Sequence, residues 1–194
     1  MVDFRVYEPG EEALDIYRFR YKIYEEEMKQ NDFYADHDQK IIRDALDDFA
    51  YNIAAYRDGE IIGTARVNFC EDGDPGYYLD YYEMESVGAD YPLKVSFSTR
   101  IMVSEEERGG VTPLLISVEC FKLGLARGVK WCFCDCAEEV RPFFARLGYE
   151  VQNPSKDHKN YGPGAVMRFN LDDPKHYDKR QSVFARYLDG VKPK

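Results

Sequence analysis

Two adjacent glycines, Gly109 and Gly110, stand where a strand-like run ends and a helical pattern begins. The first amides of a helix lack acceptors within the helix, and the helix dipole is positive there, so such a turn can bind an anion. Glycines also remove the side chains that would hold a phosphate away from the backbone. Arg108 and Thr112 could add donors, and Pro113 suits the first helical turn. A tight turn without a ligand is the alternative.

A second set of side chains is charged and lies beside apolar segments of the chain. The set consists of Arg20, Asp44, Asp47, Arg66 and Arg100. Taken singly, each is most simply a surface ion pair worth about 0–1 kcal/mol. Composition alone shows only that charged residues lie near strand-like runs, so a role for the set depends on the wider pattern of the chain.

Three cysteines alternate with other residues in the run WCFCDCA. Cys132, Cys134 and Cys136 therefore share one face of a predicted strand. Successive sulfurs on such a face lie about 6.6 Å apart, which is too wide for one tetrahedral zinc site. We predict no metal site and expect small, buried, apolar side chains. A thiol nucleophile at Cys134 or Cys136, which would need a base partner, is the alternative.

Histidines and tyrosines offer further candidates. His37, His158 and His176 stand in polar stretches and are predicted at the surface, with His37 or His158 as a general base in the alternative. The segment GYYLDYYE (76–83) could line an acyl or aromatic pocket. An aromatic-rich core is the plainer interpretation for most of these tyrosines.

The elements that must position these residues follow from hydrophobic periodicity and turn signals. We predict strands over 2–8, 51–57, 61–69, 93–103, 130–137, 149–152 and 165–171, helices over 11–28, 39–46, 79–86, 110–127, 138–148 and 172–190, and a loop over 153–164. Hairpins come first and β-α-β units later. This order predicts an α/β (α+β) fold, a mixed central sheet with helices on both faces. We expect one domain over 1–194, with 172–194 as a C-terminal helix.

Length and charge restrict the class of protein. The 194 residues suit one domain, and neither a signal peptide nor a membrane span is visible, so we expect the cytoplasm. The net charge of −10 argues against nucleic acid as a partner. Residues 121–194 nevertheless hold 14 Lys and Arg against 9 Asp and Glu, whereas residues 1–120 hold 12 against 27. This basic portion could attract an acidic partner or a phosphorylated ligand, or could be a solvated helix face.

The run VSFSTRIMVSEEERGGVTPLLISV resembles the acyl-CoA-binding segment of the GNAT superfamily of N-acyltransferases. In that superfamily a strand leads into Gln/Arg-x-x-Gly-x-Gly/Ala, which reads here from Glu107 to Thr112, with Gly110 as the central glycine. CAEEVRPFFARLGYE resembles the later strand-helix-strand segment, with Phe144 in the place of a general-acid tyrosine. The resemblance implies a GNAT fold. The donor-binding residues it implies are Ile101, Met102, Val103, Arg108, Gly109, Gly110, Val111 and Thr112.

The charged set resembles a pattern of the acyl-homoserine-lactone synthases and the N-acyl amino acid synthases. That pattern is Arg-x-x-x-Phe, Asp-x-x-Asp, Gly-x-x-Arg and Glu-x-Ser-Arg, with Tyr24 in place of its phenylalanine, Phe97 in place of its glutamate and Thr99 in place of its serine. The resemblance spans roughly residues 12–171. The catalytic residues it implies are Arg20, Asp44, Asp47, Arg66 and Arg100.

This resemblance implies an enzyme that moves an acyl group from a thioester to an amine. The donor would be the acyl-phosphopantetheine of an acyl carrier protein, or an acyl-CoA, with no permanently bound cofactor. Asp44 and Asp47 could hold an ammonium, and an arginine of the set a carboxylate, of an amino acid or a related small metabolite. An acetyl-CoA-dependent small-molecule acetyltransferase and a non-catalytic module that binds acyl thioesters are the alternatives.

Overall fold

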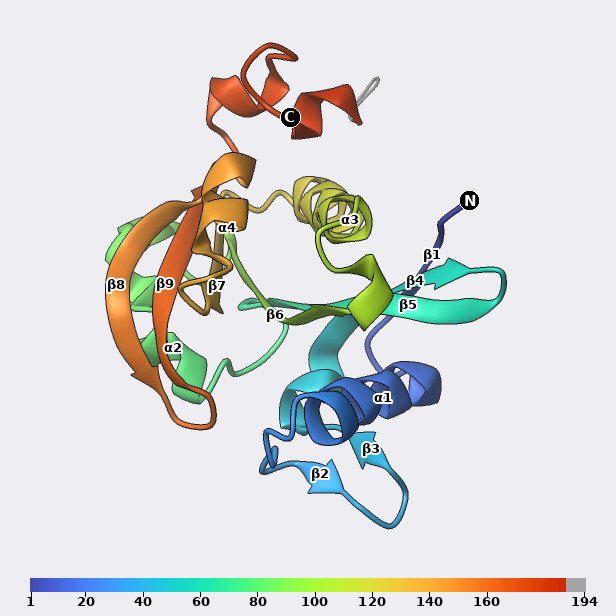
Figure 1. Ribbon diagram of the computed structural model, residues 1–194. Coiled ribbons are helices and arrows are strands. Elements are labelled where there is room, and N and C mark those ends of the chain that lie inside the picture. The colour runs from blue at the N-terminus through green and yellow to red at the C-terminus, as the bar shows by residue number, and fades with distance from the viewer. Residues whose placement is uncertain (188–194) are drawn as a thin grey trace. The chain divides into compact units, whose positions relative to one another are not determined.

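Figure 1 shows the structure, a computed structural model that describes residues 1–187. The strands of its main sheet are β1 Asp3–Tyr7, β4 Ala50–Arg57, β5 Glu60–Phe69, β6 Val95–Val103, β7 Trp131–Cys136, β8 Glu150–His158 and β9 Gly162–Asn170. Their order is β1-β4-β5-β6-β7-β9-β8. β6 and β7 pair in parallel, whereas β1–β4, β4–β5, β7–β9 and β8–β9 pair antiparallel. The predicted mixed sheet is confirmed.

Short helices and turns connect these strands. They are α1 Leu14–Tyr21, α2 Tyr77–Tyr81, α3 Thr112–Ala126 and α4 Arg141–Leu147, the π-helix η1 Lys22–Glu27, and the 3₁₀ turns η2 Ala45–Phe49, η3 Met84–Asp90, η4 Glu105–Glu107, η5 Pro174–Tyr177 and η6 Phe184–Arg186. Among the described residues, no helix has the length and apolar character needed to cross a membrane. The chain forms two compact units. The first unit is Met1–Asn68 with Ser98–Cys120, and the second is Phe69–Phe97 with the chain from Phe121 onward.

Helices cover both faces of the strands of the first unit. Ala54 packs with Ile16 and Tyr17 of α1, whereas the next residue, Ala55, packs with Ile116 of α3. Consecutive strand residues point to opposite faces, so these two alanines mark the two sides of β4. Figure 1 shows α1 and α3 on opposite sides of β4 and β5.

The β4–β5 hairpin forms as its turn residues predict. Arg57 faces Glu60 across the turn, and the two residues between them, Asp58 and Gly59, have φ angles of 53° and 84°. Left-handed conformations at both positions match the twist of the flanking strands, which explains the Asp-Gly pair.

The helix predicted over 39–46 is wrong. A two-stranded hairpin, β2 Ala35–Asp36 with β3 Ile41–Ile42, occupies its start, and η2 begins at Ala45. β-branched isoleucines favour the strand. Asp44 then caps η2, because its side chain accepts from the amide of Leu46 at 3.0 Å and so starts the turn after this residue.

The loop predicted over 153–164 is also wrong. β8 continues to His158, and β9 begins at Gly162. The pairing of β8 with β9 shifts register on both sides of Asn153, which are bulges or irregularities. Bulges let proline and glycine stand within a strand, so the composition of this segment concealed a hairpin.

The predicted C-terminal helix is not continuous. Between Asp172 and Tyr187 the chain forms only η5 and η6, and residues 188–194 lie outside the described part. Side chains compete for the amides that a helix would use: Asp178 accepts from the amide of Arg180 at 2.9 Å, and Ser182 from that of Phe184 at 3.1 Å. The prediction of a single domain over 1–194 stays a prediction.

Candidate active site

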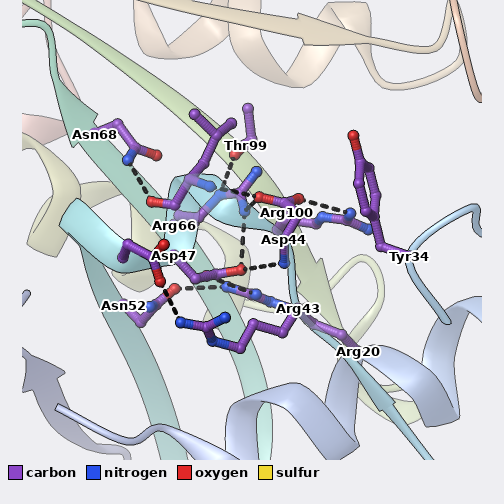
Figure 2. A network of polar contacts seen from close by, with 12 residues as sticks. Arg20, Tyr34, Arg43, Asp44, Asp47, Asn52, Arg66, Asn68, Thr99 and Arg100 are labelled. Carbon is purple, nitrogen blue, oxygen red and sulfur yellow. Dashed lines mark hydrogen bonds and ion pairs between the residues drawn. The ribbon is translucent and has the colours of Figure 1, made fainter. Parts of the chain in front are cut away.

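All five residues of the predicted charged set come together in the first unit, and a sixth joins them. The network, drawn in part in Figure 2, consists of Arg20 on α1, Asp44 and Asp47 at η2, Arg66 on β5, Arg100 on β6, and Asp32 in the loop before β2. Its three guanidinium and three carboxylate groups balance in formal charge. They lie in five segments that are remote in sequence, and the fold places them in one buried network.

Asp47 is the most enclosed carboxylate of the network, with no exposed side-chain area. Its Oδ1 accepts from Nη1 of Arg20 at 2.9 Å, and its Oδ2 accepts from Nη1 of Arg66 at 3.1 Å. Asn52 Oδ1 takes a further hydrogen bond from Nη2 of Arg20 at 2.5 Å. Figure 2 shows this arrangement, in which one carboxylate joins a helix to a strand.

Asp44 links Arg66 to Arg100. Its Oδ1 accepts from Nη1 of Arg66 at 2.6 Å, and its Oδ2 accepts from Nη2 of Arg100 at 3.2 Å. Burial alone would raise the pKa of Asp44 and of Asp47, but the neighbouring guanidinium groups outweigh it and lower both pKa values. Both carboxylates are therefore ionised at neutral pH and are weak bases.

Arg100 has the most unusual backbone of the network. Its φ angle is 55°, in the left-handed region, although it lies within β6. An L-residue there costs about 1–2 kcal/mol and interrupts regular strand pairing. Nη1 of Arg100 donates to Asp32 Oδ2 at 2.5 Å, so ion pairs to Asp32 and Asp44 fix this residue from two sides. The strained backbone conformation therefore lies at a residue of the charged network.

The expectation that any of the three arginines could hold an acceptor carboxylate needs correction. Arg20 and Arg66 have no exposed side-chain area, and each is already bonded to carboxylates of the chain. Arg100, with 5% of its side chain exposed, is the arginine of the set that retains some access. Asp32 and Asp44 hold Arg100 directly, and Arg66 is linked to it through Asp44.

The glycine turn connects η4 to α3. Gly109 has a φ angle of 77°, and a Cβ added there would meet no atom within 4 Å. Gly110 differs from the expectation, because its amide already donates to the carbonyl of Glu107 at 3.1 Å. Within residues 1–187, the amides of Gly109 and Val111 have no acceptor. Val111 is 49% exposed, so the turn presents open donors at a helix amino end.

Glu107 organises the base of this turn. Its carboxylate accepts from both Nη atoms of Arg57, with Nη2 to Oε2 at 3.1 Å, and from the hydroxyl of Thr112. The hydrogen bond from Thr112 and the pairing with Arg57 lower the pKa of Glu107. The Thr112 hydroxyl is therefore committed to Glu107, and Thr112 is fully buried, so this side chain does not donate to a ligand. Arg108 remains at the surface, paired with Glu27 at 2.8 Å.

The three strand residues predicted beside the donor belong to the core by their side chains. Met102 is buried with Phe19 and Ile23, whereas Ile101 and Val103 are half-buried in the cluster that contains Ile116. Only their backbone groups are thus suited to the polar role predicted for them.

The structure bears on the roles considered for the three cysteines of the second unit. Cys132, Cys134 and Cys136 are buried, and burial raises the pKa of Cys136 to about 11. A protonated, buried thiol is a poor nucleophile, so the alternative of a catalytic Cys136 loses its support. Among the described residues, no group of three or more His, Cys, Asp and Glu side chains could hold a metal ion.

Two of the three histidines are buried rather than at the surface, whereas His37 is exposed as predicted. His158 stacks on Tyr161 with ring centroids 4.7 Å apart, and His176 stacks on Phe169 at 4.1 Å. Burial lowers the pKa of His176 to about 4. Polar neighbours in the sequence concealed these aromatic contacts.

The sequence model of the N-acyl amino acid synthase FeeM family matches residues 15–170. The chain belongs to this family. It is therefore an N-acyltransferase, and both the enzyme class and the resemblance are confirmed. A comparison with curated protein sequences finds no match.

Solved structures support the fold of this FeeM-family chain. FeeM, an N-acyl amino acid synthase from uncultured soil microbes, superposes with a TM-score of 0.65 at 12% identity, over 97% of each chain. BjaI, a CoA-dependent acyl-homoserine-lactone synthase solved with SAM and isopentyl-CoA, gives 0.71 at 12% identity, over 100% of this chain and 92% of that one. An acyl-CoA N-acyltransferase from Pseudomonas aeruginosa gives 0.63 at 13% identity, over 86% and 98%. The GNAT fold is confirmed.

Proposed function

We propose that this chain moves an acyl group from the phosphopantetheine thioester of an acyl carrier protein to the amine of an amino acid or a related small metabolite. The observation that carries the proposal is the open turn before α3. Gly109 and Val111 offer unbonded amides there, and Gly109 leaves space where a side chain would stand. Such a turn suits the single phosphodiester of phosphopantetheine.

The acidic residues before the turn do not oppose an anion as strongly as their number suggests. Glu107 is held by Arg57 and Thr112, so its charge is compensated within the first unit. Arg108 is half-exposed and has several guanidinium donors besides the one bonded to Glu27. Of the three glutamates before the turn, Glu107 therefore adds little repulsion toward a phosphate.

The acceptor would be oriented through Arg100. The ion pairs of the network hold this guanidinium in one position. The strained backbone of Arg100 in β6 helps to set that position. The mechanism we propose is direct: the nitrogen of a neutral amine attacks the thioester carbonyl, the carbon–sulfur bond breaks, and the thiol leaves with a proton. Backbone amides of residues 101–103 would stabilise the developing oxyanion. No acyl-enzyme is required.

The charge of the chain favours an acyl carrier protein as the donor. The chain from residue 121 onward has 14 basic and 9 acidic residues, and a surplus of this sign steers an acidic carrier protein. BjaI, of the same fold, was solved with an acyl-CoA. Acyl-CoA is thus the competing donor, and both donors share the phosphopantetheine arm that the turn would bind.

Val111→Asp tests the turn without altering a glycine. The introduced carboxylate lies beside the open amides and should raise the KM for the acyl donor about tenfold or more, because two anions then oppose each other. The KM for the amine should stay the same. Val111→Asn, of the same size and without charge, should change the donor KM less than about threefold.

Steady-state kinetics with an acyl carrier protein and with the matching acyl-CoA supply the measurement. Higher kcat/KM with the carrier would support it as the donor, and the reverse order would favour CoA. Equal donor KM values for the Asp and Asn variants would remove the turn from the donor site.

A further inference from the structure

Asp32, the network carboxylate that no motif contained, is held from four directions within the first unit. Its side chain has no exposed area. Its Oδ2 accepts from Nη1 of Arg100 at 2.5 Å, and its Oδ1 accepts from the amide of Tyr34 at 2.8 Å. Its own amide donates to Oε1 of Glu25 at 2.6 Å, and its carbonyl accepts from the amide of Ala35 at 3.0 Å. Each polar group of Asp32 therefore has a partner that fixes it.

The backbone on both sides of this ion pair is strained. Lys29 and Asn31, in the segment that leads to Asp32, have φ angles of 56° and 53°. Arg100, the other partner, has a φ angle of 55°. Left-handed conformations are uncommon for residues other than glycine. They persist where the surrounding contacts over-determine them, and they cluster at functional sites. Two strained segments thus meet at one ion pair, which points to a function for that pair.

The π-helix η1 contacts both partners of the ion pair. The ring centroid of Tyr24 lies 5.3 Å from Cζ of Arg100. The next residue, Glu25, accepts the hydrogen bond from the amide of Asp32. An aromatic face beside a guanidinium attracts it, and π-helical turns occur frequently at functional sites. Two consecutive residues of η1 therefore stabilise the two halves of the pair.

The guanidinium of Arg100 is consequently held at three points. Asp32 accepts from Nη1, Asp44 accepts from Nη2, and the ring of Tyr24 lies near Cζ. The two carboxylates differ in access, because the side chain of Asp44 is 7% exposed and that of Asp32 is fully enclosed. The carboxylate of Asp32 therefore does not touch a substrate, and it can act on one only through Arg100.

We propose that Asp32 is a positioning residue that sets the orientation of the Arg100 guanidinium for the amine acceptor. This inference rests on the proposed function, in which Arg100 orients the acceptor. Two carboxylates of the chain already compensate the charge of Arg100, so the direction of its remaining N–H groups decides what it can bind. Without the Asp32 charge, only Asp44 and Tyr24 hold the guanidinium, and those N–H groups lose their fixed direction.

Asp32→Asn tests the ion pair with a side chain of nearly the same shape. The assay uses an acyl carrier protein thioester and the best of the twenty amino acids as acceptor. We expect kcat/KM for the amine to fall at least about tenfold, chiefly through KM, because the acceptor is then misplaced. The KM for the donor should stay within about twofold. Asp38→Asn, which changes an exposed aspartate between β2 and β3, is the matched control and should behave as the wild type. Equal losses for donor and acceptor would overturn the positioning role.

A double variant separates positioning from the structure of the loop. Arg100→Gln should itself lower kcat/KM for the amine. Adding Asp32→Asn should then change kcat/KM less than about twofold, because the residue through which Asp32 acts is already gone. The double variant also removes one charge of each sign, so it leaves no new unpaired charge in the network. A further loss as large as that of Asp32→Asn alone would overturn the inference, because Asp32 would then act through its loop.

The orientation of Arg100 can also be measured without turnover. In the wild type with isotope-labelled arginine, Nη1 and Nη2 of Arg100 should give separate NMR signals, because different carboxylates hinder rotation of the guanidinium. Asp32→Asn should average these signals, and Asp38→Asn should not. This result without turnover of any amino acid would reject the proposed function and keep the positioning of Arg100 by Asp32. Averaged signals in the wild type, or separate signals in Asp32→Asn, would overturn the inference.

Discussion

The buried carboxylate of Asp47 should contribute strongly to the stability of this protein. It accepts from both Arg20 and Arg66, and its side chain is completely enclosed. Asp47→Asn should lower the free energy of unfolding at pH 7 by about 3–5 kcal/mol, because two guanidinium groups then share one fewer compensating charge. Urea denaturation measures it. Asp48→Asn is the control: Asp48 pairs with Arg43 at the surface, with 61% of its side chain exposed, and should change stability by less than about 1 kcal/mol.

The difference in the free energy of unfolding between the wild type and Asp47→Asn should decrease as pH falls. The pKa of Asp47 is lowered in the folded state, so its contribution is complete above the ordinary aspartate pKa of about 4 and is lost as pH falls below it. The stability of the wild type should therefore approach that of Asp47→Asn on acidification. A difference that stayed constant from pH 7 to pH 2.5 would contradict the role given to this charge.

The sequence pattern identified the residues of the network but not their accessibility. Arg20, Arg66 and Arg100 were implied by the resemblance to a family pattern, and all three lie in the network. Asp32 was missed because it stands in a polar loop with no periodicity, and Asn52 because its strand pattern hides an amide among apolar residues. Partners of this kind are set by tertiary contacts, which local spacing does not encode.

At the scale of elements, Gly63 sets how closely α3 approaches the strands of the first unit. A Cβ on this residue of β5 would lie 2.7 Å from Cδ1 of Ile116 and 2.9 Å from Cγ1 of Val103. Gly63→Ala should therefore lower the free energy of unfolding by about 1–3 kcal/mol through overpacking. Adding Ile116→Val, which removes the nearest methyl group, should restore part of that loss. A double variant no more stable than Gly63→Ala would contradict the assigned contact.

Element prediction succeeded where local chemistry decides and failed where pairing decides. Asp58 and Gly59 specify their turn by themselves, and the β4–β5 hairpin was predicted. β8 and β9 carry Pro154 and Gly164 at places where only the bulged register of a partner strand makes them acceptable. The role of Glu107 in the glycine turn could not be predicted from local sequence either, because it depends on Arg57, 50 residues earlier.

At the scale of the whole molecule, the family and the fold were visible in the sequence, whereas the substrates were not. The predicted resemblance covered roughly residues 12–171, and the FeeM family match covers residues 15–170. The glycine turn and the charged motifs serve a reaction that many enzymes share, so they do not specify the substrates. No motif of the sequence specified the acceptor or the carrier of the acyl group.

The surface charge of the second unit should affect how fast an acidic carrier protein binds. Arg146 is an exposed residue of α4 and forms no ion pair within residues 1–187, so it is free to meet an acidic carrier. Arg146→Glu should lower kcat/KM for the acyl carrier protein at least about threefold at low salt, with little change at 0.5 M NaCl, because screening removes steering. The kcat/KM for acyl-CoA should not change. Arg18→Glu, an exposed arginine of the acidic first unit, is the control. Equal losses for both variants, or a loss that salt does not diminish, would show that the carrier does not approach through this charge.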